Sequence, residues 1–347
     1  MSEIRSQGAS FRPQPRAFQI ARSLNMRDRA ILLTLYEHKL LLTEHLKALF
    51  FRSTRRAQTC LKQLADLGLI QTWRPPVPAG LGRSQGHHTL TPLGIAIVAA
   101  LKQVAPSSLR DPGDHDLDDV HLDHRLGIAA FFCALIEASQ DHDGHCLLAW
   151  KPERVVRTAE GWIRPDGFGR YAHPGGVCDL YLEYDRGTET TRQIAAKLAG
   201  YIGVARDWTE EGAASFPNLL FVVPSPAREH AVTSALEQAL ARFKKSRKLA
   251  ALPFFVTSER HLAASGVLGQ VWRPLGPGSA RRLSIVELPS QAGLQFASSD
   301  CLGRKWNDEA RVERLYPRAR TPRFPAGAPP EPDSGKREGP GSREAKA

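Results

Sequence analysis

Three carboxylates stand at positions of the same parity within one short segment, at Asp179, Glu183 and Asp185, with Tyr181 between them. Successive side chains of a β-strand point to opposite faces, so these residues would share one face of a strand. Carboxylates held this close raise one another's pKa unless a cation or basic groups neutralise them. The spacing therefore predicts a cation-binding site, with a divalent metal ion as its expected occupant.

The segment around these carboxylates has the pattern of a β-hairpin. Alternating runs at 163–171 and 177–185 flank the residues 173–176, which read His-Pro-Gly-Gly and are typical of a turn. If the hairpin closes at this turn, Asp166 falls opposite residues 182–183, to within two positions. The hairpin would then bring a fourth carboxylate to the cluster.

Length and composition limit the protein to which this cluster belongs. The 347 residues suit two domains with appendages, and 42% hydrophobic and 24% charged residues are typical of a globular protein. The sequence has no apolar run of the roughly 18 residues that a membrane helix needs, and its polar start lacks the pattern of a signal peptide. We therefore expect no membrane association and a cytoplasmic location. The five cysteines have no CxxC pair, which predicts reduced, mostly buried thiols.

The basic excess lies in the first third of the chain. Residues 1–110 contain 16 Lys and Arg against 5 Asp and Glu, whereas the remaining residues contain 31 of each class. A localised basic surface is typical of a nucleic-acid-binding module, because lysine and arginine displace counterions from phosphates. The other interpretation is a basic surface that serves solubility.

The same region has the pattern of a helix-turn-helix followed by two strands. Apolar residues at helical spacing predict a helix over 26–38, a second after Thr43 and a third after Ser53. Strands at 69–74 and 86–91 would flank a Pro- and Gly-rich loop before a helix that begins at a proline. This order resembles a winged helix, which would bind double-stranded DNA with its third helix in the major groove.

The polar residues near the start of the third helix and at the wing tip are the candidate DNA-binding residues. They are Arg52, Thr54, Arg55, Arg56, Gln58, Lys62 and Arg83. Arginines on a surface helix can also be merely solvated, and winged helices can bind proteins. DNA is the partner that the charge distribution favours.

The organisation of the whole chain follows from these segments. We expect a flexible basic arm at 1–25, the winged helix at 26–110, an acidic linker at 111–123, a second domain at 124–290 and a mostly disordered tail at 291–347. The second domain has the element order αβββαβ followed by αβ, which predicts a mixed sheet with helices on its faces. The fold class is therefore α+β or α/β.

This element order, with the acids where they stand, resembles the PD-(D/E)xK nuclease-like superfamily and its restriction-endonuclease-like fold. Pro165-Asp166 match the first acidic element of that family and Glu183 matches the second, whereas Asp185 occupies the position of its lysine. Some members carry the lysine on the following helix, where Lys197 stands. The resemblance implies catalysis by Asp166, Glu183 and Lys197, with Mg²⁺ held by Asp166, Asp179 and Glu183. Lys197 also lies beside apolar residues and could simply extend along them.

At a closer level the chain resembles the plasmid replication-relaxation family over residues 26–290. The resemblance is carried by RRAQTCLKQLADLGL, HRLG, WKPER, RPDG, LEYDRGTE and KLAGY. It implies an accessory role in the replication, DNA relaxation or mobilisation of a plasmid or integrated element, with a relaxase or replication protein as a candidate partner. It does not by itself imply a cleavage reaction.

Two functions remain open from the sequence. In the first, the carboxylates hold a metal ion and the second domain cleaves DNA. In the second, the protein is a non-catalytic winged-helix regulator, and its carboxylates pair with Arg164, Arg170 and Arg186 as a structural network within a domain that supports the fold or binds a partner.

Overall fold

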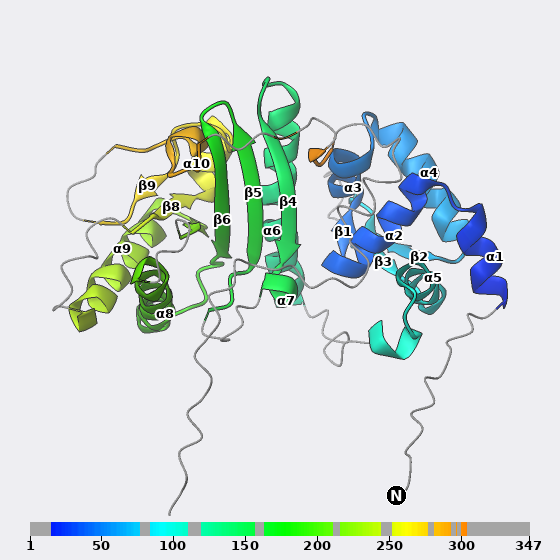
Figure 1. Cartoon of the computed structure of the whole chain (residues 1–347), viewed down its shortest axis with the longest axis horizontal. Coiled ribbons are helices and arrows are strands. Elements are labelled where there is room, and N and C mark those ends of the chain that lie inside the picture. The colour runs from blue at the N-terminus through cyan, green and yellow to red at the C-terminus, as the bar shows by residue number, and fades with distance from the viewer. Residues whose placement is uncertain are drawn as a thin grey trace, which may run out of the picture.

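The computed structural model describes residues 15–76, 84–109, 119–156, 163–210, 216–243, 252–276, 281–292, 296 and 300–303 (Figure 1). Two units are visible, one built around a three-stranded sheet and one built around a six-stranded sheet. Both combine helices with strands. The mixed α and β composition predicted from the sequence is therefore present.

The first unit consists of five helices, three short strands and a 3₁₀ turn in the part of the chain described. In chain order these are α1 (Pro15–Ser23), α2 (Met26–His38), β1 (Leu41–Leu42), α3 (Thr43–Phe50), α4 (Thr54–Asp66), β2 (Ile70–Trp73), β3 (His87–Leu90), α5 (Pro92–Lys102) and η1 (Pro106–Leu109). The strands form an antiparallel sheet in the order β1-β3-β2. The three expected helices and the two following strands thus occur in the expected order, with β1 as an added strand.

Helix α4 shows how the local sequence fixes an element of this unit. The Ser53 hydroxyl accepts a hydrogen bond from the backbone N–H of Arg56 at 3.3 Å, which satisfies one donor of the first turn. Ala57, Leu61 and Leu64 recur at helical spacing and are at most 2% exposed. The apolar stripe attaches α4 to the other helices and leaves its polar side in solvent.

The second unit places helices on both faces of a mixed sheet. Its elements are α6 (Asp119–Gln140), β4 (Cys146–Pro152), α7 (Glu153–Val156), β5 (Gly167–His173), β6 (Gly176–Tyr184), α8 (Thr191–Glu210), β7 (Asn218–Val223), α9 (Pro226–Leu240), η2 (Ala241–Phe243), β8 (Phe254–Ser258), α10 (Glu259–Ser265), β9 (Arg273–Pro274) and η4 (Ile285–Glu287). The strand order is β4-β5-β6-β7-β8-β9. Strands β6, β7 and β8 run parallel, and the remaining neighbours pair antiparallel.

Alternating side chains of β6 divide between two hydrophobic cores. Leu180 and Leu182 pack in the core that contains α6, which is visible behind the strands in Figure 1. Tyr181 packs in the core formed with α8 and α9, on the opposite face. Glu183 has the same parity as Tyr181, so its side chain points toward the α8 face. The predicted alternation of this strand is confirmed.

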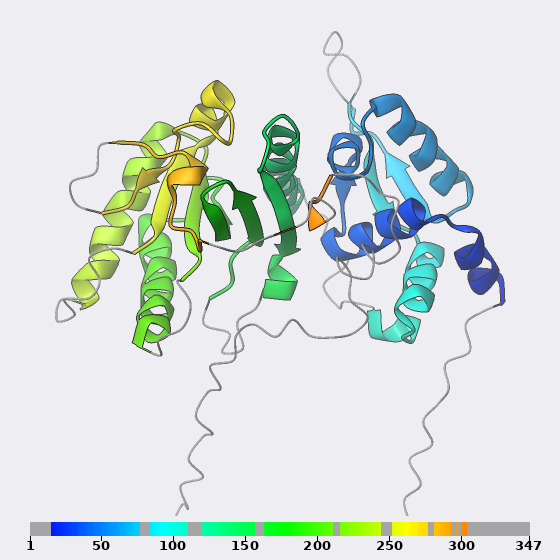
Figure 2. The same ribbon diagram turned by 45° about the horizontal axis from the view of Figure 1, so that its top comes forward.

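The two units are packed against each other along helix α6 and strand β4, which face α3, β1 and α2 of the first unit (Figure 2). The rings of His38 and Trp150 lie 3.9 Å apart between centroids. The Lys151 ammonium contacts the Glu37 carboxylate at 3.0 Å, and the Arg154 guanidinium donates to two carbonyl oxygens at the end of α2. Buried apolar residues of α2, α3 and α6 belong to one continuous cluster. Contacts of this kind fix the orientation of the units.

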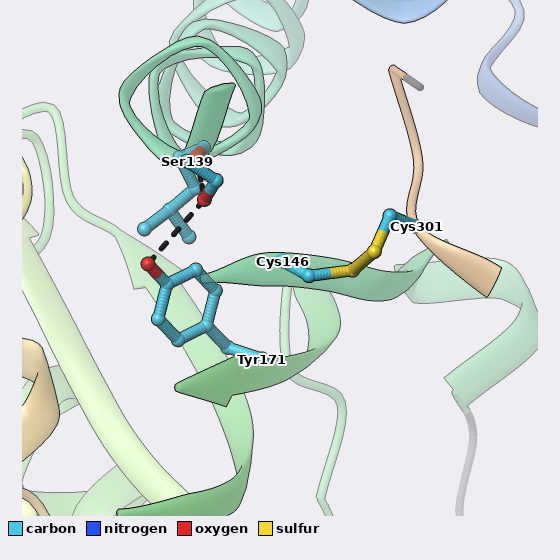
Figure 3. Close-up of a disulfide and its surroundings, with 5 residues drawn as sticks. Ser139, Cys146, Tyr171 and Cys301 are labelled. Carbon is cyan, nitrogen blue, oxygen red and sulfur yellow. Dashed lines mark hydrogen bonds between the residues drawn. A yellow bond between two sulfur atoms is a disulfide. The ribbon is translucent and has the colours of Figure 1, made fainter. Parts of the chain in front are cut away.

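A disulfide joins Cys146 in β4 to Cys301, across 155 positions of the sequence (Figure 3). The prediction that all cysteines are reduced is therefore wrong for this pair, whereas Cys60, Cys133 and Cys178 are free thiols. Sequence spacing gave no sign of the pair, because only the fold brings the two residues together. The short segment 300–303 lies between α6 and α3, where the backbone of Gly303 approaches Ile136 and Ala48.

Several expected boundaries differ from the structure. Residues 15–23, assigned to a flexible arm, form α1, which packs against α5. Residues 119–123, assigned to the linker, are the first turn of α6, so the second unit begins before residue 124. Near the end of the expected second domain, Ile285–Glu287 form the 3₁₀ turn η4. Residues 1–14, 111–118 and 304–347 lie outside the described residues.

A search of the described helices for a membrane-spanning segment finds none with the required length and apolar character.

Helix α5 approaches the backbone of Leu69 so closely that its third residue must be glycine. A Cβ atom at Gly94 would lie 2.1 Å from the Leu69 carbonyl oxygen, and this carbonyl is held in place by hydrogen bonds from Thr91. We expect Gly94→Ala to lower the free energy of unfolding by about 1–3 kcal/mol, because the helix must shift. Urea denaturation of the full chain measures the effect.

The matched control is Gly203→Ala in α8, where a Cβ would meet nothing within 4 Å. This change should be neutral or stabilising by roughly 0.5–1 kcal/mol, because alanine is the better helix former. Equal effects of the two substitutions would contradict the close approach of α5.

Candidate functional site

The register of the β5–β6 hairpin places Asp166 across from Glu183. Gly167 pairs with Leu182, so the residue before Gly167 lies opposite the residue after Leu182. The Tyr184 backbone N–H donates to Asp166 Oδ2 at 2.8 Å, which fixes the carboxylate at the end of the strand pair. The pairing predicted from the turn position is confirmed.

Glu183 is a buried carboxylate, 1% exposed, held between two residues of helix α8. Lys197 Nζ donates to Glu183 Oε2 at 2.9 Å, and the Tyr201 hydroxyl donates to Oε1. Lys197 and Tyr201 are four positions apart and therefore lie on the same side of the helix. The structure thus brings Asp166, Glu183 and Lys197 to one place, the three residues to which the resemblance to PD-(D/E)xK nucleases assigns catalysis.

Burial sets the charges of this group. Burial raises the pKa of Glu183 to about 8, and the charge of Asp166 adds to this rise, whereas Lys197 and Tyr201 oppose it. Burial lowers the pKa of Lys197, but the charges of Glu183, Asp166 and Glu189 outweigh that effect and the net shift is upward. Lys197 therefore remains protonated at neutral pH, whereas Glu183 is largely protonated there and becomes the charged partner of Lys197 as the pH rises through about 8.

Two residues that the sequence analysis did not assign complete the surroundings. His124 Nε2 lies 3.2 Å from Asp166 Oδ1, and Glu189 Oε1 lies 3.0 Å from Lys197 Nζ. Burial lowers the pKa of His124, but its hydrogen bond to Asp166 and the nearby carboxylates raise it above the ordinary value overall. Both residues belong to motifs noted in the sequence, HRLG and LEYDRGTE. No spacing rule linked them to Asp166 or Lys197, because they lie on different elements.

The third expected metal ligand, Asp179, does not join this group. Its carboxylate forms a bidentate pair with Arg170 at 2.7 and 2.8 Å, on the neighbouring strand. Asp179 stands four residues from Glu183, which corresponds to about 13 Å along a strand. Asp166, Asp179 and Glu183 therefore do not point to one place where all three could bind the same metal ion. Within the described residues, no group of three or more His, Cys, Asp or Glu is arranged to hold a metal ion.

The remaining charged residues of the hairpin have structural partners. Asp185 pairs with Arg228 at 2.5 Å, and Arg186 pairs with Asp123 at 2.9 Å. Arg164 is exposed. The pairing that the second interpretation expected is thus present at Arg170, whereas Asp185 pairs with Arg228, which that interpretation did not name. The pairs found for Glu183 and Asp166 are with Lys197 and His124.

Glu183 and Lys197 line a small open pocket together with His124 and Glu189. A second crevice lies between the two units and is lined by the end of α2 from the first unit and by α6, β4, α7 and Asp166 from the second. His124 borders both spaces. The acidic site is thus reached from the seam between the units.

A different constellation in the second unit resembles a nucleophile with a base, but its geometry excludes that role. Ser258 Oγ lies 2.7 Å from His261 Nδ1, and Glu229 Oε1 lies 2.9 Å from the same nitrogen. A catalytic triad needs the serine and the carboxylate on different ring nitrogens. Glu229 also contacts Arg282 at 2.6 Å, and Ser258 is fully buried, so this group is a structural network.

The candidate DNA-binding residues on α4 and just before its start are turned toward solvent. Arg52, Arg55, Arg56, Gln58 and Lys62 are exposed, and Thr54 is half-buried. Lys62 contacts Asp66 at 2.6 Å within the helix. Arg83 lies outside the described residues.

A groove of about 810 Å³ separates α4 from the small sheet. It is lined from the helix by Gln58 and Lys62 and from the sheet by Thr72, Arg74 and His88. Burial lowers the pKa of His88 to about 4, so this histidine is neutral, and its ring nitrogens contact the hydroxyls of Thr43 and Thr72. The basic charge of the groove therefore comes from lysine and arginine.

Comparison with known families identifies the chain. The profile described as replication-relaxation matches residues 32–219, more than half of the 347 residues. The chain belongs to the replication-relaxation family. The matched region includes α4, Asp166, Glu183 and Lys197, and the family fits a role in the replication or DNA relaxation of a plasmid or mobile element. No curated protein and no solved structure matches the chain.

Replacing Lys197 should reveal how much the burial of Glu183 lowers the free energy of unfolding. A carboxyl group whose pKa is higher in the native state than in the unfolded state stabilises the native protein at low pH. This contribution is lost as the pH rises through the native pKa. In Lys197→Met that native pKa should rise further, since the compensating cation is gone. We expect the same loss of stability at every pH well below 8, where native Glu183 is protonated in both proteins. The loss should be larger by roughly 1 kcal/mol at pH 9 than at pH 5, because at pH 9 the wild-type carboxyl group has ionised beside Lys197 and the variant's has not. Denaturant titrations at both pH values measure it.

Lys62→Met is the control for this experiment, because Lys62 is also in a helix and paired, but its side chain is 75% exposed. The free energy of unfolding of Lys62→Met should fall by no more than about 1 kcal/mol at either pH. A Lys197→Met protein whose loss does not depend on pH would show that the ion pair does not determine the protonation of Glu183.

Proposed function

We propose that this protein is a DNA-binding accessory protein of a plasmid or integrated mobile element, and that it binds duplex DNA through a winged helix formed by residues 26–102. The observation that carries the proposal is the exposed polar side of α4. Four of the candidate arginine, glutamine and lysine side chains lie on it, with Arg52 just before the helix, next to an open groove. In a winged helix this third helix enters the major groove, and the wing contacts the backbone.

The charge distribution supports the same interpretation. Residues 1–110 carry the whole net charge of +11, and phosphate contacts made by such residues account for most of the affinity of DNA-binding proteins. Membership of the replication-relaxation family supports a DNA partner as well. A relaxase or replication protein is the proposed protein partner.

The second unit suggests a further activity, metal-dependent cleavage of a phosphodiester. It is favoured by the meeting of Asp166, Glu183 and Lys197, which resembles the acidic and basic residues of PD-(D/E)xK nucleases. Mg²⁺ is held in proteins by one or two carboxylates together with water and phosphate oxygens. Asp166 and Glu183 would supply the two carboxylates, since each bonded oxygen keeps a second lone pair.

The chain's own residues would have distinct roles in that reaction. A bound Mg²⁺ would polarise the phosphodiester and activate water. The Tyr184 N–H and His124 hold Asp166 in one orientation, and Tyr201 does the same for Glu183. Protonated Lys197 would offset negative charge on the phosphate.

The alternative is a non-catalytic regulator whose second unit is structural or binds a partner. The pairs Arg170–Asp179 and Arg228–Asp185 favour it, because they neutralise two of the four carboxylates without a metal. The alternative leaves the proposed DNA binding by α4 unchanged. Variants of α4 therefore test DNA binding, and variants of Asp166 and Glu183 test cleavage.

Loss of charge on α4 should weaken duplex binding by the full chain. We expect Arg55→Ala and Arg56→Ala each to cost about 1–3 kcal/mol of binding free energy if the arginine contacts a base. A phosphate contact would instead weaken all sequences alike and reduce the salt slope by about 1. Fluorescence anisotropy at several salt concentrations distinguishes these outcomes.

Arg281→Ala is the control for the loss of one exposed arginine, because Arg281 pairs with Glu287 in the second unit. If Arg281→Ala weakened binding as much as Arg55→Ala and Arg56→Ala, α4 would not be the binding element.

Cleavage should depend on Asp166 and Glu183 but not on Asp179. We expect the full chain to nick supercoiled plasmid with Mg²⁺ or Mn²⁺, and Asp166→Asn or Glu183→Gln to abolish nicking. Asp179→Asn should retain it, since Asp179 is paired with Arg170 away from the site. Gel electrophoresis of the plasmid measures the reaction.

The regulator interpretation makes the opposite predictions. It expects no nicking by the wild-type protein and a melting temperature that does not change with millimolar Mg²⁺, because a bound ion would stabilise the native state by mass action.

A further inference from the structure

The loop that joins β6 to α8, residues 185–190, leads from the acidic strand to the helix that carries Lys197. At its start, the backbone N–H of Asp185 donates to the Val222 carbonyl at 2.9 Å, so this residue continues the pairing of β6 with β7. Near its end, Glu189 Oε1 lies 3.0 Å from Lys197 Nζ. The conformation of the loop therefore decides where the Glu189 carboxylate lies relative to the ammonium group of Lys197.

Arg228 of α9 binds both ends of this loop. Its Nε donates to Asp185 Oδ2 at 2.5 Å, and one of its terminal nitrogens donates to the backbone carbonyl of Glu189. The side chains of Arg228 and Asp185 are 16% and 3% exposed, so the ion pair is shielded from solvent. A guanidinium carries its donors in one rigid plane and can bind two acceptors at once. Arg228 thus fixes the backbone from which the Glu189 side chain extends.

The position of Arg228 follows from the way α9 begins. Ser225 accepts a hydrogen bond from the Arg228 backbone N–H at 3.3 Å, and Pro226 stands at the start of the helix. Helix α9 follows directly after β7, the parallel neighbour of β6. The first turn of α9 therefore lies beside the end of β6, where the positive end of the helix dipole also favours the carboxylate of Asp185.

The turn at the start of the loop depends on Asp185 as well. The Gly187 backbone N–H donates to Asp185 Oδ1 at 2.7 Å, so Asp185 binds the loop with one oxygen and Arg228 with the other. Gly187 has a φ of 81°, a conformation that residues with a side chain rarely adopt. The loop is therefore held by the carboxylate of Asp185 from within and by Arg228 from the neighbouring helix.

We infer that Arg228 is a positioning residue for Lys197. It holds the loop, the loop places Glu189, and the ammonium group of Lys197 lies between Glu189 and Glu183, at 3.0 and 2.9 Å. Asp185 stands where the resemblance to PD-(D/E)xK nucleases would place the lysine, and it anchors a lysine that the next helix supplies instead. The inference rests on the proposed cleavage site and specifies how the cation of that site is held.

A purely structural role for Arg228 makes a different prediction. An arginine that only attaches α9 to β6 would contribute to stability independently of Lys197. Substitutions at sites without a shared partner have additive effects, whereas those within one network do not. Glu189 is the shared partner here, because its carbonyl binds Arg228 and its carboxylate binds Lys197. Additivity therefore distinguishes the two roles.

The test is a double-mutant cycle on the full chain at pH 7, with Arg228→Gln and Lys197→Met made singly and together. Urea denaturation gives the unfolding equilibrium constant of each protein. Each single change should raise this constant, and the double variant should raise it about tenfold less than the product of the two single effects. In a Glu189→Ala background the effects should be additive to within about twofold, because the link between the two residues is gone.

Arg170→Gln is the matched control, because Arg170 also forms an arginine–carboxylate pair, with Asp179 on the same sheet. Its cycle with Lys197→Met should be additive to within about twofold. Arg228→Lys is a second variant that should lower the coupling, since lysine lacks the planar group that binds Asp185 and the Glu189 carbonyl together. It decides the question if Arg228→Gln fails to fold.

Additive effects of Arg228→Gln and Lys197→Met would overturn the inference, and so would a coupling that persists in Glu189→Ala. Plasmid nicking gives a separate readout. If the full chain nicks, Arg228→Gln should lower kcat about tenfold with little change in KM, because a displaced Lys197 affects the transition state more than DNA binding. An unchanged kcat would also overturn the inference. A wild-type protein that does not nick would contradict the proposed cleavage, and the stability cycle would still decide the role of Arg228.

Discussion

The burial of Glu183 is the constraint on which the second unit depends. A carboxylate at the centre of a sheet is costly unless it is paired and hydrogen-bonded. Lys197 supplies the ion pair and Tyr201 a hydrogen bond, both from one side of α8. The helix must therefore pack against β6 with one rotation about its axis and one position along it. Asp166 is held opposite by strand register. The proposed chemistry and the fold of this unit therefore depend on the same contacts.

The packing of the two units gives this site its surroundings. Strand β4 contributes Trp150 and Lys151 to the seam, and α7 contributes Arg154. Because the helix α6 begins at the same seam, His124 reaches Asp166 from there. A basic first unit is thus fixed beside an acidic site, an arrangement that fits the proposed binding of DNA. The disulfide at Cys301 attaches a distant segment to the same region.

The carboxylates of the hairpin differ in function because their partners differ. Asp179 and Asp185 are paired with arginines, which form bidentate bonds and keep their charge. Glu183 is paired with a lysine, a compact cation on a flexible chain that can also turn toward a phosphate. The alternation of side chains along the strand places all three carboxylates on the same face and does not distinguish between them. The neighbouring elements divide them into structural acids and candidate site acids.

The sequence by itself determined the features that depend on local periodicity. These include the helices of the first unit, the two-faced strand β6, the hairpin that brings Asp166 to Glu183, and the position of Lys197 on the following helix. It could not determine features that depend on packing between distant elements. The disulfide, the pairing of Asp179 with Arg170, the contact of His124 with Asp166 and the crevice between the units belong to this second group. The physical reason is that periodicity fixes which side of an element a residue occupies, whereas only the packed tertiary structure decides what lies against that side.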